Sequence, residues 1–348
     1  MPFYYKIGWI RNKKERSRIV SNLIALRKHL KKEIPRRTVN DTLLLATWNI
    51  RDFDSNKFKH GPRMRESYFY IAEIISAFDI IALQEINKNL RSLKRVMDIL
   101  GSNWQYITTD VTEGRSGNKE RMTFVYDRNK VSFQNIAGEI VLPETKLIAG
   151  KRQFARTPYL VAFQSGWFKF MLCTIHIYYG GKGGEKFERR VKEIKQISKF
   201  ISKRADDKEY NFVLLGDFNI VTPDCDTMYA LKGSGFKIPN ELKHPTNIAE
   251  DMFYDQIAFK TRPGELRLGG SDKNAGVFRY YKSVFKNDEY NVYRKYMDST
   301  KLNSAGRAKS KKVRYYTNTW RTFQMSDHYP LWVELKIDFS KDYLKKLM

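Results

Sequence analysis

Polar residues capable of chemistry lie at the ends of six apolar, strand-like runs of this chain. They are Asn49, Glu85, His176, Asp217 with Asn219, Asp255, and Asp327 with His328. Carboxylates, amides and imidazoles of this kind bind metal ions, activate water and hold phosphate oxygens. A carboxylate at the end of an apolar strand is costly if it stays unpaired, so its repetition predicts that these strand ends converge on one site.

The stretch Gly216–Asn219 is the most informative of these points. It follows the apolar run Phe212–Leu215, so a buried strand ends by presenting a carboxylate and an amide. The same tetrapeptide is also an ordinary turn sequence, and each of the six points taken alone fits a turn or a cap. Their combination is what favours a catalytic site.

The segments between these points predict mixed β-sheets covered by helices, an α/β architecture of the α+β type. Strands are expected at Leu43–Trp48, Asp79–Leu83, Met122–Tyr126, Tyr159–Phe163, Phe168–Ile177, Phe212–Leu215, Tyr254–Phe259 and Leu331–Ile337. Helices are expected at Arg63–Ala77, Leu90–Leu100 and Lys186–Lys203. Neighbouring strands with no helix between them indicate hairpins, so the pattern is not a regular βαβ repeat.

Two segments stand apart from this pattern. Within residues 1–40, aliphatic side chains recur at helical spacing from Ile19 to Ile34 among basic residues. This pattern predicts either a helix docked on the main domain or a basic amphipathic helix that meets DNA, membrane or a partner protein. We favour the docked helix. Residues 260–325 are rich in Lys, Arg and aromatic rings. Such rings either stack on unpaired bases or belong to the core, and the second is expected for Val277–Tyr281, which has the pattern of a strand.

The charge balance favours a polyanionic partner. The 348 residues include 64 Lys and Arg against 38 Asp and Glu, a net charge of +26. Nucleic acid or an acidic membrane surface fits such an excess. The two cysteines imply no disulfide framework, and no apolar run reaches membrane-spanning length. We therefore expect a cytoplasmic protein without stable membrane insertion. The sequence contains no His/Cys cluster of the kind that binds zinc.

Five motifs in order resemble the endonuclease/exonuclease/phosphatase superfamily. They are Thr47–Arg51, Leu83–Glu85, Ile175–His176, Gly216–Asn219 and Ser326–Pro330. The resemblance runs from about Leu43 to Ile337 and is greatest to deoxyribonuclease I-like nucleases, on the evidence of Asn49-Ile50-Arg51, Lys119-Glu120-Arg121 and Arg156-Thr157-Pro158. The disulfide of the secreted nuclease is absent, because no second cysteine stands near Asp255 to pair with Cys225.

The resemblance implies a four-layered sandwich, in which two packed mixed β-sheets are flanked by helices. It also implies three parts of the chain. Residues 1–40 would form a basic helical extension and residues 41–340 the catalytic domain, with the basic, aromatic-rich stretch around 260–325 inserted in it.

The resemblance further implies roles for the polar residues. Glu85, Asn49 and Asp327 would hold Mg²⁺, with Mn²⁺ or Ca²⁺ able to substitute or assist. His328 would pair with Asp255 and His176 with Glu120, one histidine serving as acid and the other as base, in an order that the sequence leaves open. Asp217 would orient water and Asn219 a phosphate oxygen, while Arg51 and Arg156 would clamp flanking phosphates. The list of candidates is Asn49, Arg51, Glu85, Glu120, Arg156, His176, Asp217, Asn219, Asp255, Asp327 and His328.

The function predicted from these features is a Mg²⁺-dependent phosphodiesterase, most simply an endonuclease that cleaves DNA with little sequence preference. A phosphoinositide or sphingomyelin-type phosphodiesterase of the same superfamily is the alternative, although Phe253-Tyr254-Asp255-Gln256 stands where inositol phosphatases carry a Trp-Cys-Asp-Arg signature. A nucleic-acid-binding module without catalysis is the third hypothesis.

Overall fold

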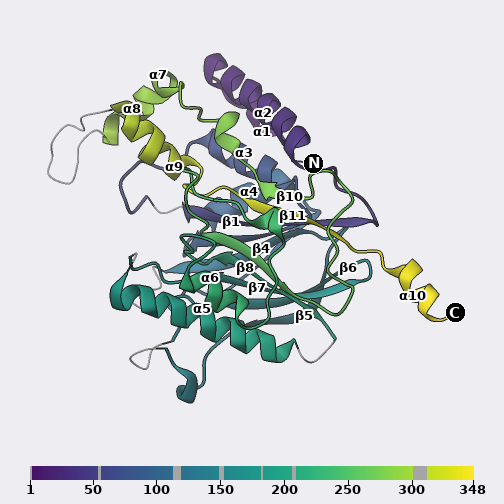
Figure 1. Cartoon of the computed structure of the whole chain (residues 1–348). Helices are drawn as coiled ribbons and strands as arrows, with labels where there is room; N and C mark the ends of the chain where they lie inside the picture. Colours follow the sequence, from purple (N-terminus) through teal and green to yellow (C-terminus); the bar gives the residue numbers. More distant parts are fainter. Residues whose placement is uncertain are drawn as a thin grey trace.

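The computed structural model describes residues 2–53, 56–112, 119–148, 153–181, 183–205, 209–300 and 312–348. Two β-sheets pack face to face within this part of the chain (Figure 1). The first sheet has the order β10-β11-β1-β2-β4-β3 and the second the order β5-β6-β7-β8-β9. Both sheets are mixed, because β1 and β2 run parallel, as do β7 and β8, while the other neighbours are antiparallel.

The strands extend beyond the predicted runs. In the first sheet they are β1 (Thr42–Phe53), β2 (Ile80–Asn87), β3 (Trp104–Thr108), β4 (Glu120–Asp127), β10 (Ala275–Val277) and β11 (Leu331–Lys336). In the second they are β5 (Ser132–Glu139), β6 (Tyr159–Ser165), β7 (Phe168–His176), β8 (Asn211–Asp217) and β9 (Asp255–Lys260). The sequence analysis missed β3 and β5, and the strand that it expected at Val277–Tyr281 is wrong, because β10 ends at Val277 and a short 3-10 helix, η3 (Tyr280–Lys282), follows.

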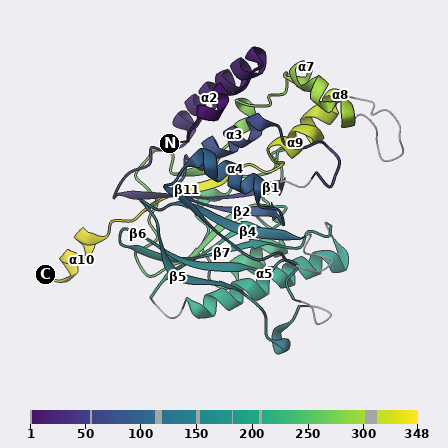
Figure 2. The ribbon, with the colours of Figure 1, turned by 180° about the vertical axis from the view of Figure 1, so that it is seen from behind.

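Helices cover the outer faces of both sheets (Figures 1 and 2). The α-helices are α1 (Tyr5–Gly8), α2 (Lys13–Glu33), α3 (Arg65–Ile75), α4 (Arg91–Leu100), α5 (Gly184–Arg204), α6 (Asp226–Lys232), α7 (Tyr290–Tyr293), α8 (Lys312–Tyr315), α9 (Arg321–Gln324) and α10 (Ser340–Lys346). The remaining turns of helix are η1 (Glu144–Lys146), η2 (Asn240–Leu242), η4 (Arg294–Thr300) and η5 (Tyr316–Trp320). The four layers expected from the resemblance are therefore confirmed.

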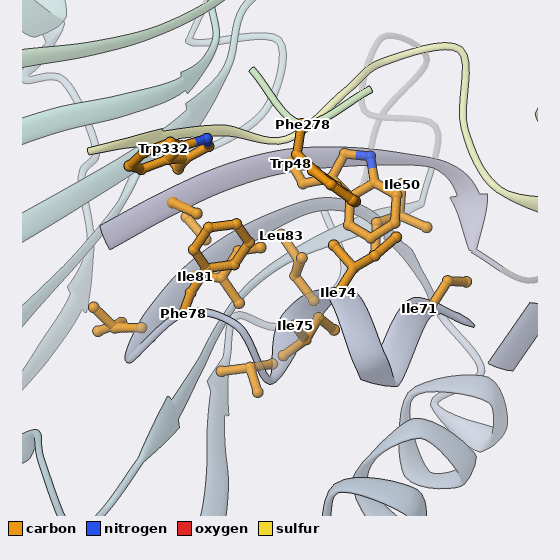
Figure 3. Packing of buried hydrophobic residues seen from close by; sticks show 14 of the residues in the cluster. Trp48, Ile50, Ile71, Ile74, Ile75, Phe78, Ile81, Leu83, Phe278 and Trp332 are labelled. Carbon is orange, nitrogen blue, oxygen red and sulfur yellow. The ribbon is translucent and has the colours of Figure 1, made fainter. Parts of the chain in front are cut away.

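Apolar side chains from the first sheet and α3 pack against one another as part of the larger core (Figure 3). Trp48, Leu83 and Ile74 meet there and are fully buried. Gln84 crosses to the second sheet, where its amide donates to the Thr174 hydroxyl at 2.9 Å. The first sheet is thus joined to α3 by apolar packing and to the second sheet by a buried hydrogen bond close to the strand ends that carry the polar residues.

Helix α2 lies beside α3 on the outer side of the first sheet (Figure 1). Its residues Ile19, Leu23, Leu26 and Leu30 are buried in the larger core. The aliphatic face of α2 is therefore packed against the rest of the protein, as expected for a docked helix. The proposed division into an extension and a catalytic domain stays a prediction.

The aromatic rings between residues 260 and 325 are mostly core. Phe278, Tyr280, Tyr281, Phe285, Tyr293, Tyr316 and Trp320 are all buried. They stack on one another, as Tyr293 does on Tyr316 with ring centroids 5.9 Å apart. The idea that these seven rings stack on unpaired bases is therefore wrong, since neighbouring side chains already cover their faces.

Candidate active site

Strand register brings His176, Asp217 and Asp255 side by side at the ends of three neighbouring strands. His176 of β7 is paired with Asp217 of β8, and Asp217 is paired with Asp255 of β9. All three side chains are buried. The convergence of strand ends predicted from the sequence is therefore present within the second sheet.

The first sheet contributes Asn49 and Glu85 through an irregularity in the pairing of β1 with β2. The register passes from Asn49 opposite Gln84 to Phe53 opposite Ile86, so that three residues of β1 face the single residue Glu85. Glu85 has a φ of 60°, which is uncommon for a residue with a side chain. Such bulges re-aim side chains and are frequent beside active sites.

Asn49 links the two sheets at this point. Its side-chain Nδ2 donates to Glu85 Oε1 and to Asp217 Oδ2, both at 3.0 Å. Glu85 Oε2 accepts from the backbone N–H of Asp52 at 2.7 Å. The amide oxygen Oδ1 of Asn49 is buried and has no hydrogen-bond partner among the described residues.

His176 is held by a carboxylate that is itself held by an arginine. Its Nδ1 lies 2.7 Å from Glu120 Oε2, and Arg156 donates to Glu120 Oε1 from Nε at 3.1 Å and from Nη2 at 2.8 Å. Burial opposes the charged form of Glu120, but His176 and Arg156 outweigh it and lower the pKa of Glu120 to about 2. Burial and Arg156 likewise oppose protonation of His176, but Glu120 and Asp217 raise its pKa overall.

His328 has a carboxylate partner of its own. Its Nδ1 lies 2.7 Å from Asp255 Oδ2, which also accepts from the Thr246 hydroxyl at 2.6 Å. Burial disfavours the imidazolium, but the carboxylates of Asp255 and Asp217 outweigh it and raise the pKa of His328 to about 10. The two carboxylates therefore favour the protonated form of His328 at neutral pH.

Asp217 lies between the two histidines. Its Oδ2 is 3.5 Å from His176 Nε2 and 4.0 Å from His328 Nε2. Its Oδ1 accepts from the backbone N–H of Asn219 at 2.9 Å. One carboxylate therefore has an imidazole nitrogen within 4.0 Å on each side.

Asn219 has a φ of 54° and donates from its side-chain amide to the carbonyl of Ile177 at 2.8 Å. The fully buried Arg190 of α5 donates to the carbonyl of Asn219 at 2.7 Å and to the carbonyls of Tyr179 and Gly181. The segment after β8 is therefore tied to the segment after β7 through one guanidinium.

Arg51 and Asp327 form the outer side of the site. Arg51 Nη1 lies 3.0 Å from Asp327 Oδ2 and donates to the Thr322 hydroxyl at 2.5 Å. Asp327 is half-exposed, in contrast to the buried His328 that follows it. Arg156 is 8% exposed and bound to Glu120, so its role as a phosphate clamp stays a prediction.

Glu85 and Asn49 offer a site suited to a hard cation. Both oxygens of Glu85 accept from neutral N–H groups, and no Lys, Arg or His of the described ranges forms an ion pair with it. Burial and the neighbouring charges of Glu120 and Asp327 raise the pKa of Glu85. A cation beside Glu85 and the unpartnered Asn49 oxygen would reverse that effect, so these residues fit a divalent metal with oxygen ligands.

Asp217, Asp255 and His328 form a second group that could hold a metal, since their ligand atoms lie within 4.8 Å of one another. His328 Nδ1 is engaged by Asp255 at 2.7 Å, and the neighbouring carboxylates raise the pKa of the ring, which favours its protonated form. A protonated imidazole has no lone pair for a metal ion. We therefore regard the Asn49–Glu85 group as the better metal site.

Solved structures of low sequence identity share this architecture. An endonuclease/exonuclease/phosphatase family protein from Bacteroides thetaiotaomicron matches with a TM-score of 0.56 and 18% identity, over 86% of this chain and 99% of that chain. The chain has the endonuclease/exonuclease/phosphatase fold. A mannosyl-6-phosphatase from the same organism matches with a TM-score of 0.54, 18% identity and coverage of 84% and 99%. D. rerio TDP2 complexed with single strand DNA product matches with a TM-score of 0.51, 10% identity and coverage of 84% and 98%.

Searches by sequence add nothing to this likeness. No family model and no curated protein matches the chain. The endonuclease/exonuclease/phosphatase fold predicted from five short motifs is nevertheless confirmed. None of the helices in the described part of this fold is long and apolar enough to cross a bilayer.

Several supporting residues escaped the sequence analysis. Thr246 holds Asp255, and Ser326 accepts from the backbone N–H of His328 at 3.0 Å while donating to the carbonyl of Asn49 at 2.6 Å. Ser326 is part of the motif Ser326–Pro330, so its position near the site could have been predicted from the sequence. Thr246 and Arg190 lie outside every motif, and nothing in the sequence pointed to them.

Proposed function

We propose that the chain belongs to the endonuclease/exonuclease/phosphatase superfamily and is a divalent-metal-dependent phosphodiesterase, acting on DNA as an endonuclease with little sequence preference. The observation that carries the proposal is Asp217 between two histidines that each have a buried carboxylate partner. The fold is compatible with this chemistry, and the charge of +26 favours a polyanionic substrate.

His328 and His176 would stabilise the charge that develops on phosphorus. Each points Nε2 toward Asp217 while Nδ1 is held by a carboxylate, so the tautomer and the ring orientation are fixed. With a pKa of about 10, His328 is a proton donor at neutral pH and a poor base. We therefore assign it to hydrogen bonding with a phosphate oxygen or to protonation of the leaving oxygen.

Asp217 is then the candidate that orients the attacking water. Its Oδ2 is an acceptor at the centre of the group, and Asn49 and Asn219 fix the carboxylate from both sides. A water held there would face a phosphate bound by His176 and His328. Asn219 would hold a non-bridging oxygen of that phosphate, as predicted from the sequence.

Glu85 and Asn49, with Asp327 nearby, would hold the metal. When bound, Mg²⁺ would neutralise charge on the phosphate and on the leaving oxygen. Arg51 would contact a flanking phosphate at the half-exposed rim, where its guanidinium already lies beside Asp327. Contacts of this kind position the backbone without reading bases, which is why little sequence preference is proposed.

Small phosphoesters are the second candidate substrates. One structure of the same fold is described as a mannosyl-6-phosphatase, and its likeness in TM-score is no weaker than that of the TDP2 complex. Phosphoinositides and sphingomyelin belong to the same test. A cytoplasmic location stays a prediction.

The test is one substrate panel with matched variants. Purified protein would be incubated with supercoiled plasmid, linear duplex, single-stranded DNA, RNA, mannose 6-phosphate, phosphoinositide vesicles and sphingomyelin vesicles, with Mg²⁺, Mn²⁺, Ca²⁺ or EDTA. We expect plasmid nicking that needs the metal, is strongly reduced at low Mg²⁺ in Glu85→Gln and is lost in His328→Ala, but is kept in Glu139→Gln, a change of an exposed carboxylate on β5. If both site variants still nick plasmid, the proposed active-site residues are wrong. If only sugar phosphate or lipid is hydrolysed, the proposed DNA substrate is wrong.

A further inference from the structure

A ladder of side chains leads from the candidate active site to solvent. The guanidinium of Arg51 lies 4.1 Å from the ring centroid of Phe323 in α9. The ring of Phe323 contacts that of Phe58 with centroids 5.6 Å apart and stacks on His60 at 4.3 Å. Because Arg51 also pairs with Asp327, the residue before His328, the ladder begins at the proposed site.

The outer member of this ladder is exposed. Phe58 is 54% exposed, whereas Phe323 beneath it is 7% exposed. The ammonium of Lys57 lies 5.0 Å from the centroid of the Phe58 ring. A single exposed apolar ring needs no explanation by itself. Here the exposed ring packs at 50° against a buried ring and lies close to the cations Lys57 and Arg51, an arrangement suited to an unpaired base and its phosphates.

The region of residues 260–325 gains a specific role from this arrangement. Its other aromatic rings are largely packed in the core, but Phe323 faces the segment that follows β1 and supports Phe58. Thr322 beside it binds the Arg51 guanidinium. The region therefore fixes both the cation and the inner ring of the ladder.

We propose that Phe58, backed by Phe323, is a stacking platform for an unpaired base of the nucleotide next to the phosphate held at the candidate active site. The inference rests on the proposed function in one respect, that the substrate is a nucleic acid. It adds a subsite, and it adds a preference for single-stranded or frayed nucleic acid, because the face of a paired base is covered by its neighbours.

The first test measures binding without catalysis. Fluorescence anisotropy in EDTA would compare an end-labelled single-stranded DNA 12-mer with the same strand in a blunt duplex. We expect Phe58→Ala to weaken single-strand binding roughly tenfold or more and to change duplex binding much less. Phe58→Trp should restore it, and Tyr229→Ala, which removes a ring of similar exposure on α6, should have no effect.

The second test locates the base. Abasic residues would be placed at successive positions of the 12-mer, and each strand would be titrated against wild type and Phe58→Ala. Stacking predicts one position at which loss of the base weakens binding to wild type but not to the variant, since the contact is already gone. Equal penalties in both proteins at every position would overturn the platform.

The outcomes separate the platform from the proposed function. Single-strand binding that depends on Phe58 supports the stacking platform even if no nucleic acid is cleaved. Absence of cleavage would contradict the proposed endonuclease activity but not the stacking platform. Equal binding of single strands by wild type and Phe58→Ala would overturn the platform even if plasmid nicking is strong. Melting curves that coincide for the two proteins would show that the exposed ring acts on the ligand and not on the fold.

Discussion

The substitution Asp255→Asn is expected to move the alkaline limit of activity to lower pH. Asp255 is the carboxylate hydrogen-bonded to His328 Nδ1, and together with Asp217 it holds the pKa of His328 near 10 against the effect of burial. Asparagine keeps the shape and a hydrogen-bond acceptor for Thr246 but removes the charge. The imidazolium then loses its strongest stabilising neighbour.

The size of the effect follows from the fraction of protonated His328. With a pKa of about 10, about 99% of this side chain is protonated at about pH 8, and with the ordinary value of 6.5 only about 3% would be. Because Asp217 remains in place, this drop of about 30-fold is the upper limit for kcat/KM at that pH. Near pH 6 the two proteins should differ little in protonation.

Two measurements would check this expectation. The pH dependence of kcat/KM between about pH 5.5 and pH 10 reports the group in the free enzyme, and NMR of ¹⁵N-labelled histidine reports the pKa of His328 directly. Asp251→Asn, which removes an exposed carboxylate from the segment before β9, is the control for net charge. An alkaline limit that is the same in wild type and Asp255→Asn would refute the charge-pair reasoning.

The same pair makes stability depend on pH. The pKa of His328 is higher in the folded protein than in the unfolded chain, so the stabilisation is complete below about pH 6.5 and is lost as the pH rises through about 10. Wild type should therefore lose stability between these values. In Asp255→Asn the loss should occur at lower pH.

Three further substitutions test the metal site, the first helix and the link to α5. Glu85→Gln should raise the Mg²⁺ concentration for half-maximal activity at least about tenfold, read from metal titrations against Glu139→Gln, because a charged oxygen ligand is lost. Leu26→Ala should lower the free energy of unfolding by about 2–5 kcal/mol, and denaturant should unfold the variant in a single transition. The control, Val20→Ala on the exposed face of α2, should change the free energy of unfolding by less than about 0.5 kcal/mol. Two separate unfolding transitions would contradict docking of α2 on the rest of the protein. Arg190→Met should lower both kcat and stability, since each buried carbonyl left without a donor costs about 1–3 kcal/mol, and unchanged kcat would show that the guanidinium does not position the site.

The parts of the fold that could be predicted are those in which a long apolar run ends at a polar residue. Strands β8 and β11 were expected to within two residues at either end, because their apolar runs have clear ends. Strand β5 was missed because it lies at the edge of its sheet and most of its residues are exposed, so no apolar run marks it. Local sequence carries little information about a strand that only one neighbour stabilises.

The candidate residues could be named from motifs, but their mutual geometry could not. Asn49 and Glu85 were expected just after their strands, whereas they lie within β1 and β2 at a bulge. A bulge is set by the pairing of two strands distant in sequence, and no single stretch encodes it. For the same reason Arg190 and Thr246 were missed, since their partners are backbone or carboxylate groups from other elements.

The charges of the proposed site argue for a divalent cation independently of the individual contacts. When all of the carboxylates and both histidines are ionised, five carboxylates face four cationic groups. They are Glu85, Glu120, Asp217, Asp255 and Asp327 on one side, and Arg51, Arg156, His176 and His328 on the other. The site alone therefore carries about one negative charge, and a phosphodiester adds another, which would repel the substrate in a largely buried environment. A divalent cation beside Glu85 would restore neutrality, so substrate binding should strengthen the binding of the metal, and the metal that of the substrate, by the same factor.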